Sequence, residues 1–135
     1  MSEQEKIGAG QQTPPNLNLY NLEDIEMLSK NDDALFGKLL TVLVSMFSLE
    51  MENVKRFSAD KNWKELAEVA HKLKTSLTHI RAESTRQIVR KLEDHEHHTN
   101  EELKTLADEL CTELENMLIY LKIDLTEFEK KQSSQ

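Results

Sequence analysis

Residues 63–80, WKELAEVAHKLKTSLTHI, decide the fold of this chain. Their apolar positions recur in steps of three and four: Trp63, Leu66, Ala70, Leu73, Leu77 and Ile80. That spacing is typical of the seam along which one α-helix packs against others. The segment therefore predicts a helix of a bundle, buried along one face and exposed along the other.

His71 directly follows Ala70 of this seam, and one residue turns a helix by about 100°. We therefore expect its imidazole at the edge of the buried face, with one ring nitrogen open to water. Lys74 lies three residues on and on the same side. A neutral ring nitrogen can attack phosphorus, and an ammonium can neutralise charge on the transferred oxygens. The pair suits receiving and holding a phosphoryl group.

Composition favours an all-α protein. The 135 residues include three glycines and two prolines, and after Pro15 only Gly37 remains of either type. Hairpins and βα loops depend on such residues, so strands are not expected. A Walker loop or a dinucleotide-binding loop also needs a glycine cluster. We therefore expect no bound cofactor, no ATP site and no autonomous kinase activity.

Four substantial helices and a short lead-in helix are predicted from the apolar periodicity. The lead-in helix covers 21–28, and Asn31 to Asp33 then caps a long helix that breaks at 58–61. After the 63–80 helix, another begins near Glu83 and ends in the polar run 94–100. Thr99 and Glu102 form a capping box that opens the last helix.

Short connections between these helices imply antiparallel neighbours, so we predict an up-down-up-down four-helix bundle. The bundle is assigned to residues 17–131. Residues 1–16 are polar and are interpreted as a tail or linker, and residues 132–135 as a polar C-terminal tail.

Charge and apolar content restrict the partners. The net charge of −8 argues against nucleic acid. The longest apolar run, 39–49, is shorter than the roughly 20 residues that span a bilayer, so no membrane is expected. The polar start lacks a secretory signal and Cys111 is the single cysteine, which together predict a cytoplasmic protein.

One basic zone interrupts the acidic chain. Residues 61–91 carry eight basic and three acidic side chains, a balance of +5, whereas the rest of the chain sums to −13. His71 lies within this zone. We interpret the zone as an electrostatic landing surface for an acidic partner.

A second stripe runs beside the seam and gives the supporting residues of the candidate site: Lys64, Ala67, His71, Lys74, Thr78 and Arg81. Ala67 leaves lateral room one turn before His71. Glu68, three residues before His71, can accept a hydrogen bond from the second ring nitrogen and select the tautomer.

Residues 70–76, AHKLKTS, resemble the A-H-x-L-K-G-S core of the histidine phosphotransfer (HPt) domain of bacterial multistep two-component phosphorelays. Residues 62–66, NWKEL, are similar to the D/N-W-x-x-L that commonly starts that helix in the family. The order and length of the helices also agree, so the resemblance covers about residues 17–125.

The resemblance implies a phosphohistidine carrier that relays a phosphoryl group between the aspartates of receiver domains. It implies His71 as the phosphoacceptor and Lys74 as the charge-stabilising neighbour. Receiver domains and a hybrid sensor kinase would be the partners, and the divalent ion would belong to the receiver, not to this chain. A monomer is expected.

Two positions depart from the family pattern. Thr75 stands where the family usually has glycine, which adds bulk four residues from His71. Arg81 stands where glycine often ends the helix. These departures keep an alternative open: a degenerate docking or inhibitory module that binds a receiver or kinase without carrying phosphate.

Metal-binding interpretations are weaker. Glu68 and His71 have the Glu-x-x-His spacing of di-iron bundles, but no second such pair exists in the chain. The histidines at 95, 97 and 98 crowd one connection, where a solvated polar segment is the simpler interpretation. We therefore expect no metal site.

Overall fold

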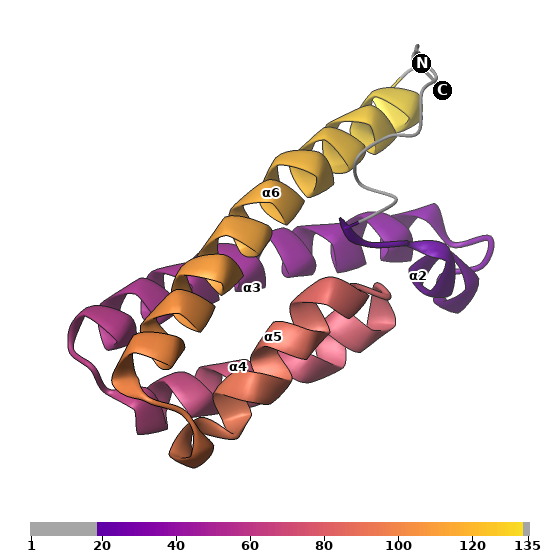
Figure 1. Ribbon diagram of the computed structural model, residues 1–135. Helices are drawn as coiled ribbons and strands as arrows, with labels where there is room; N and C mark the ends of the chain where they lie inside the picture. Colours follow the sequence, from indigo (N-terminus) through magenta and orange to yellow (C-terminus); the bar gives the residue numbers. More distant parts are fainter. Residues whose placement is uncertain (1–18, 134–135) are drawn as a thin grey trace, which may run out of the picture.

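The computed structural model describes residues 19–133, which form helices joined by short connections (Figure 1). In chain order the elements are α2 (Glu23–Leu28), α3 (Asp33–Ala59), α4 (Trp63–His79), α5 (Glu83–Glu93), the 3₁₀ turn η1 (His95–His97) and α6 (Asn100–Ser133). The all-α class is confirmed, because no strand occurs among these residues.

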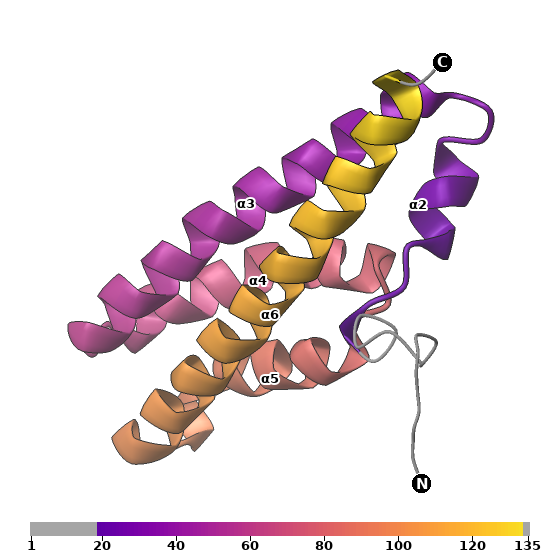
Figure 2. The same cartoon turned by 90° about the horizontal axis from the view of Figure 1, so that it is seen from above.

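The four long helices form a bundle in which each packs beside its neighbours in the chain. α3 lies against α4, α4 against α5 and α5 against α6, and α6 closes the bundle against α3 (Figures 1 and 2). This arrangement is the up-down-up-down topology that short connections predict.

Side-chain caps begin the helices where the sequence indicates. Asp32 accepts a hydrogen bond from the Leu35 amide at 3.0 Å, which caps α3. Asn62 caps α4 in the same manner. At the start of α6, the Thr99 hydroxyl accepts from the Glu102 amide at 3.1 Å, and the Glu102 carboxylate accepts from the Thr99 amide at 2.9 Å. The capping box is therefore formed in both directions.

The core is built on the α4 seam. Leu66, Ala70, Leu73, Leu77 and Ile80 are all fully buried, whereas Trp63 lies half-buried at the helix start. The other helices meet this seam with buried apolar side chains: Leu40, Phe47 and Val54 of α3, Val89 and Leu92 of α5, and Leu110, Leu114 and Leu121 of α6. α4 is thus held by α3 and α5, and buried side chains of α6 complete the same core cluster.

α3 and α6 continue past the hairpin formed by α4 and α5, and α2 lies beside this extension (Figure 2). The Asn21 amide donates to the Ile80 carbonyl at 2.6 Å. The Tyr20 hydroxyl donates to the Asp124 carboxylate of α6. These contacts attach the start of the described chain to both halves of the bundle.

Element bounds differ slightly from the sequence expectation. α2 begins at Glu23, because Asn21 and Leu22 lie in the non-helical segment that joins Tyr20 to α2. α6 runs to Ser133, past the bundle end expected at 131, and the Gln132 side chain donates to Asp33 at 3.3 Å. The expected tail at 1–16 lies outside the described residues.

α3 is long and apolar enough to cross a membrane when judged by length and composition alone. This is weak evidence, because the core helix of a bundle passes the same test. In the structure α3 packs its inner face against α4 and α6.

Candidate functional site

His71 lies on the exposed side of α4, halfway along the helix. Its side chain is 67% exposed, although the adjacent seam residues Ala70 and Leu73 are fully buried. The imidazole therefore stands farther from the core than the expected position at the edge of the buried face.

Glu93, the last residue of α5, holds the ring of His71. The Nδ1 atom of His71 lies 2.6 Å from Oε2 of Glu93. Lys74 Nζ binds the same carboxylate, at 3.1 Å from Oε1 and 3.3 Å from Oε2. One carboxylate thus fixes both side chains that the sequence singles out, and it comes from the neighbouring helix.

The charge state of Glu93 determines which nitrogen of the neutral ring carries the proton. Partial burial raises the pKa of Glu93, but hydrogen bonds from His71 and Lys74 outweigh it, and the net pKa lies below the ordinary value. Glu93 is therefore ionised near neutral pH and can only accept hydrogen bonds. It follows that Nδ1–H donates to Glu93 and that Nε2 of a neutral ring keeps its lone pair.

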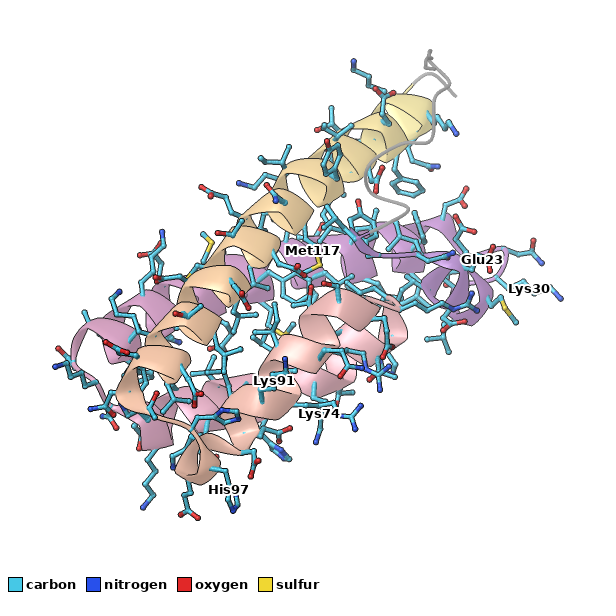
Figure 3. The ribbon with its side chains drawn as sticks, viewed as in Figure 1. Glu23, Lys30, Lys74, Lys91, His97 and Met117 are labelled. Carbon is cyan, nitrogen blue, oxygen red and sulfur yellow. The ribbon has the colours of Figure 1, made fainter. Side chains whose placement is uncertain are left out.

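A groove of about 530 Å³ borders the ring on the side of η1. It is lined by Lys64, Ala67, Glu68, His71, Glu93, His95 and Glu96. Lys74 lies outside this set. Figure 3 shows Lys74 projecting from the α4–α5 hairpin into solvent, and His97 at the tip of the connection that follows.

The predicted site residues fall into two groups. Lys64, Ala67 and Glu68 share the groove with His71, and Lys74 joins them through Glu93. The remaining three, Thr75, Thr78 and Arg81, lie outside the groove.

Those three residues have separate surroundings. Thr75 is exposed one turn beyond His71. The Thr78 hydroxyl donates to the Lys74 carbonyl at 2.9 Å within its own helix. Arg81 lies past the end of α4 and forms ion pairs with Glu23 and Asp24 of α2.

The assignment of Glu68 as the residue that selects the tautomer needs correction. The hydrogen bond to Nδ1 comes from Glu93, whereas Glu68 is exposed and only lines the same groove. The physical reason is the crossing of two helices, because α5 brings a carboxylate to the flank of α4 on which the ring lies.

Glu93 escaped the sequence reasoning, although the sequence contains an indication of it. The turn between α4 and α5 is centred near Arg81, so residues at similar distances before and after it become neighbours in an antiparallel hairpin. His71 lies ten residues before Arg81 and Glu93 twelve after it. Counting outward from the turn places Glu93 within two residues of the position opposite His71.

Two other histidines of the region have local partners, whereas Nδ1 of His95, which lines the groove, is buried without a hydrogen-bond partner among the described residues. His97 Nδ1 lies 2.6 Å from Asp94, and His98 Nδ1 lies 3.4 Å from Glu102. Within residues 19–133 no three His, Cys, Asp or Glu side chains are grouped so that they could hold a metal ion.

The family model of the Hpt domain matches residues 37–123, which is more than half of the chain. The matched range contains His71, Lys74 and Glu93. Comparisons with curated proteins and with solved structures gave no match. The helical bundle and the exposed histidine agree with the matching family, and the chain belongs to the Hpt domain family, with a phosphotransfer-related role in two-component signalling.

Proposed function

We propose that this chain is a phosphohistidine carrier in which Nε2 of His71 receives a phosphoryl group from an aspartyl phosphate and passes it to a second aspartate. The observation that carries the proposal is the geometry at His71. The ring is 67% exposed, and its Nδ1 is bound to Glu93, which leaves Nε2 as the nucleophilic atom.

The transfer step is balanced without a further reactant. The Nε2 lone pair attacks phosphorus, the P–O bond to the donor aspartate breaks, and that aspartate leaves as a carboxylate. The ring becomes positively charged because Nδ1 keeps its proton. The carboxylate of Glu93, 2.6 Å from Nδ1, stabilises this charge. The reverse sequence delivers the group to the next receiver.

Lys74 serves the same step from the other side of Glu93. Its ammonium is partly exposed and lies 3.1 Å from Glu93, so it stays on the flank of α4 that carries His71. A cation in this position offsets the negative charge of an incoming phosphoryl group. Lys64 adds a further positive side chain to the groove.

The partners follow from the family and from charge. Hpt domains interact with receiver domains in phosphorelays, and they are phosphotransfer carriers rather than classical enzymes. The basic zone at 61–91 complements the carboxylate-lined pocket of a receiver, which would bring the divalent ion. A hybrid sensor kinase would supply the phosphoryl group through its own receiver.

The direct test is label transfer from a phosphorylated receiver. The wild-type chain should gain an acid-labile, base-stable label, and His71→Gln should abolish it. His79→Gln is the matched control, since His79 is an exposed histidine two turns farther along α4. Its label should equal that of the wild type.

One outcome would support the alternative, a module that docks without carrying phosphate. A receiver that forms a stable complex with the wild-type chain and yet transfers no label would exclude the carrier. Thr75 is the feature in favour of this alternative, because it is exposed one turn from His71 at the position where the family usually has glycine.

A further inference from the structure

The outer face of α3 carries a second seam, against which no other helix of residues 19–133 packs. Its positions follow steps of three and four: Leu35, Lys38, Val42, Ser45, Leu49 and Glu52. All six are exposed, and the three large apolar side chains, Leu35, Val42 and Leu49, are 36%, 55% and 60% exposed. In Figure 2, α3 forms one edge of the bundle, with no helix beyond it.

α3 is more apolar than its place in the bundle requires. Its most apolar stretch of 18 residues qualifies by composition as a membrane span, yet only 22% of that stretch is buried. No charged residue occurs from Leu39 to Leu49. In a chain with 31% charged residues, a continuous neutral face of this kind indicates a surface that another molecule covers.

We propose that this face joins two copies of the chain, with α3 packed antiparallel against α3 of the second copy about a two-fold axis between Val42 and Ser45. A three-four repeat is the pattern by which two helices interlock. Ser45 is small, so Val42 of the second copy can approach it closely. Leu39 and Met46, both half-buried on the α4 side of the seam, extend the apolar contact.

Charge determines the antiparallel direction. In a parallel pair in register, Lys38 would face Lys38 and Glu52 would face Glu52, and both contacts are repulsive. In the antiparallel pair, Lys38 packs beside Leu49 of the second copy and lies one layer from its Glu52. A face whose two charges attract only after a two-fold rotation is complementary to itself.

The second copy leaves His71 free. On one flank of α4, Lys72 and Ser76 contact Glu50 and Met46 of α3. On the other flank, His71 and Lys74 contact Glu93 of α5. The α3 seam lies beyond the first flank, so both histidines of the dimer remain open to a receiver. This dimer replaces the monomer expected from the sequence, and it does not depend on the proposed function.

The seam from Leu35 to Glu52 is about 26 Å long at 1.5 Å per residue, so the interface is small and the dimer weak. Sedimentation velocity of the full chain over a concentration series should show the mass rising from one chain towards two in the micromolar to submillimolar range. Val42→Lys should remain a single chain throughout. The matched control is Ile119→Lys, at a 51% exposed apolar residue of α6, which should dimerise like the wild type.

Charge reversal and cross-linking test the direction of packing. Lys38→Glu should weaken the dimer, and the double variant Lys38→Glu with Glu52→Lys should restore it. With Cys111 replaced by serine, a Leu35→Cys chain mixed with a Glu52→Cys chain should cross-link, and neither should cross-link alone. A single-chain mass at every concentration, loss of the dimer in Ile119→Lys but not in Val42→Lys, or cross-links between like chains would overturn the proposal.

Discussion

Glu93 is the residue on which the geometry of the site depends. Its carboxylate accepts a hydrogen bond from Nδ1–H of His71 and pairs with the ammonium of Lys74. The Glu93 side chain is only 21% exposed. A shielded acceptor of this kind strengthens both contacts, because less water competes for them. The orientation of the ring and the position of the nearby cation are therefore set together, by a side chain that does not touch phosphorus.

Replacing Glu93 with glutamine should slow phosphoryl transfer to His71 by about tenfold, since a charged hydrogen bond and a neutral one differ by about 1.4 kcal/mol. The rate of label uptake from a phosphorylated receiver measures the effect. Glu68→Gln changes a glutamate of the same groove that forms no hydrogen bond with the ring, and its rate should stay at the wild-type value.

Imidazole ¹⁵N shifts separate positioning from a general loss of structure. In the wild type they should report the Nδ1–H form of His71, and in Glu93→Ala a mixture of the two tautomers. If label uptake were equally fast in Glu93→Gln and the wild type, or slow in Glu68→Gln, the role of fixing the His71 tautomer would return to Glu68.

Glu93 also makes stability depend on pH in a defined window. Its pKa in the folded chain lies below the ordinary value of 4.5, so the unfolded chain binds the proton first as pH falls. The contribution of the carboxylate is complete above about pH 4.5 and is lost as pH drops through the folded pKa. Urea unfolding of the wild type and Glu93→Gln should show a constant difference near neutral pH and a smaller one in acid. A difference that persists unchanged at low pH would contradict this account.

At the scale of elements, the end of α4 explains a departure from the family pattern. Arg81 has φ of 53°, in the left-handed region that favours glycine. Its guanidinium pairs with Glu23 at 3.0 Å and Asp24 at 2.7 Å, which ties α2 to the α4–α5 turn. Arg81 thus has a strained backbone conformation that glycine would adopt without strain, but it forms ion pairs that glycine cannot form.

Two substitutions at Arg81 separate strain from ion pairing. Both Arg81→Ala and Arg81→Gly remove the ion pairs, but only alanine keeps the strained φ. The melting temperatures of both the wild type and Arg81→Gly should therefore exceed that of Arg81→Ala. The glycine variant should melt about 4 °C above the alanine variant. Equal melting temperatures for the two variants would mean that the turn relaxes to another conformation.

On α4, Thr75 is the residue expected to limit how closely a receiver can approach. It is exposed on the outer face of α4, and within residues 19–133 its hydroxyl has no hydrogen-bond partner. Thr75→Ala removes bulk and keeps the helix, so uptake of label from a receiver should become faster, by an amount equal to about 1 kcal/mol of barrier or less. A slower Thr75→Ala would show that the hydroxyl contacts the incoming group.

At the scale of the whole molecule, part of the packing that stabilises the fold lies far from His71, at the extended ends of α3 and α6. α3 and α6 extend past the α4–α5 hairpin, and Phe36 and Phe128 meet edge to face there with ring centroids 5.1 Å apart. Phe128→Ala should lower the free energy of unfolding by about 2 kcal/mol, because this half-buried ring packs between two helices. Label uptake at a temperature where the variant is folded should be unchanged. A variant that unfolds normally but takes up label slowly would show that the two ends are coupled.

Periodicity predicted most of the fold, since the α4 seam, the caps at Asp32 and Asn62 and the Thr99–Glu102 box are all local features of the sequence. The same spacing placed His71 beside the seam, at the edge of the buried face, whereas the structure places its side chain farther out, 67% exposed. Glu93 could not be found by spacing within one helix, because it reaches the ring across a hairpin. The left-handed φ of Arg81 and its pairing with α2 likewise depend on how separate elements meet.

Because only Nδ1 of His71 is held, by Glu93, the contact affects how long a phosphoryl group on Nε2 would last. Since Nδ1 is bound to Glu93 and the side chain is 67% exposed, a phosphoryl group on Nε2 would be open to water and to hydrolysis. The lifetime of the message is then set by the intrinsic chemistry of the P–N bond and by how soon the next receiver arrives. Under the proposed function, such a chain would pass the phosphoryl group onward and would not store it.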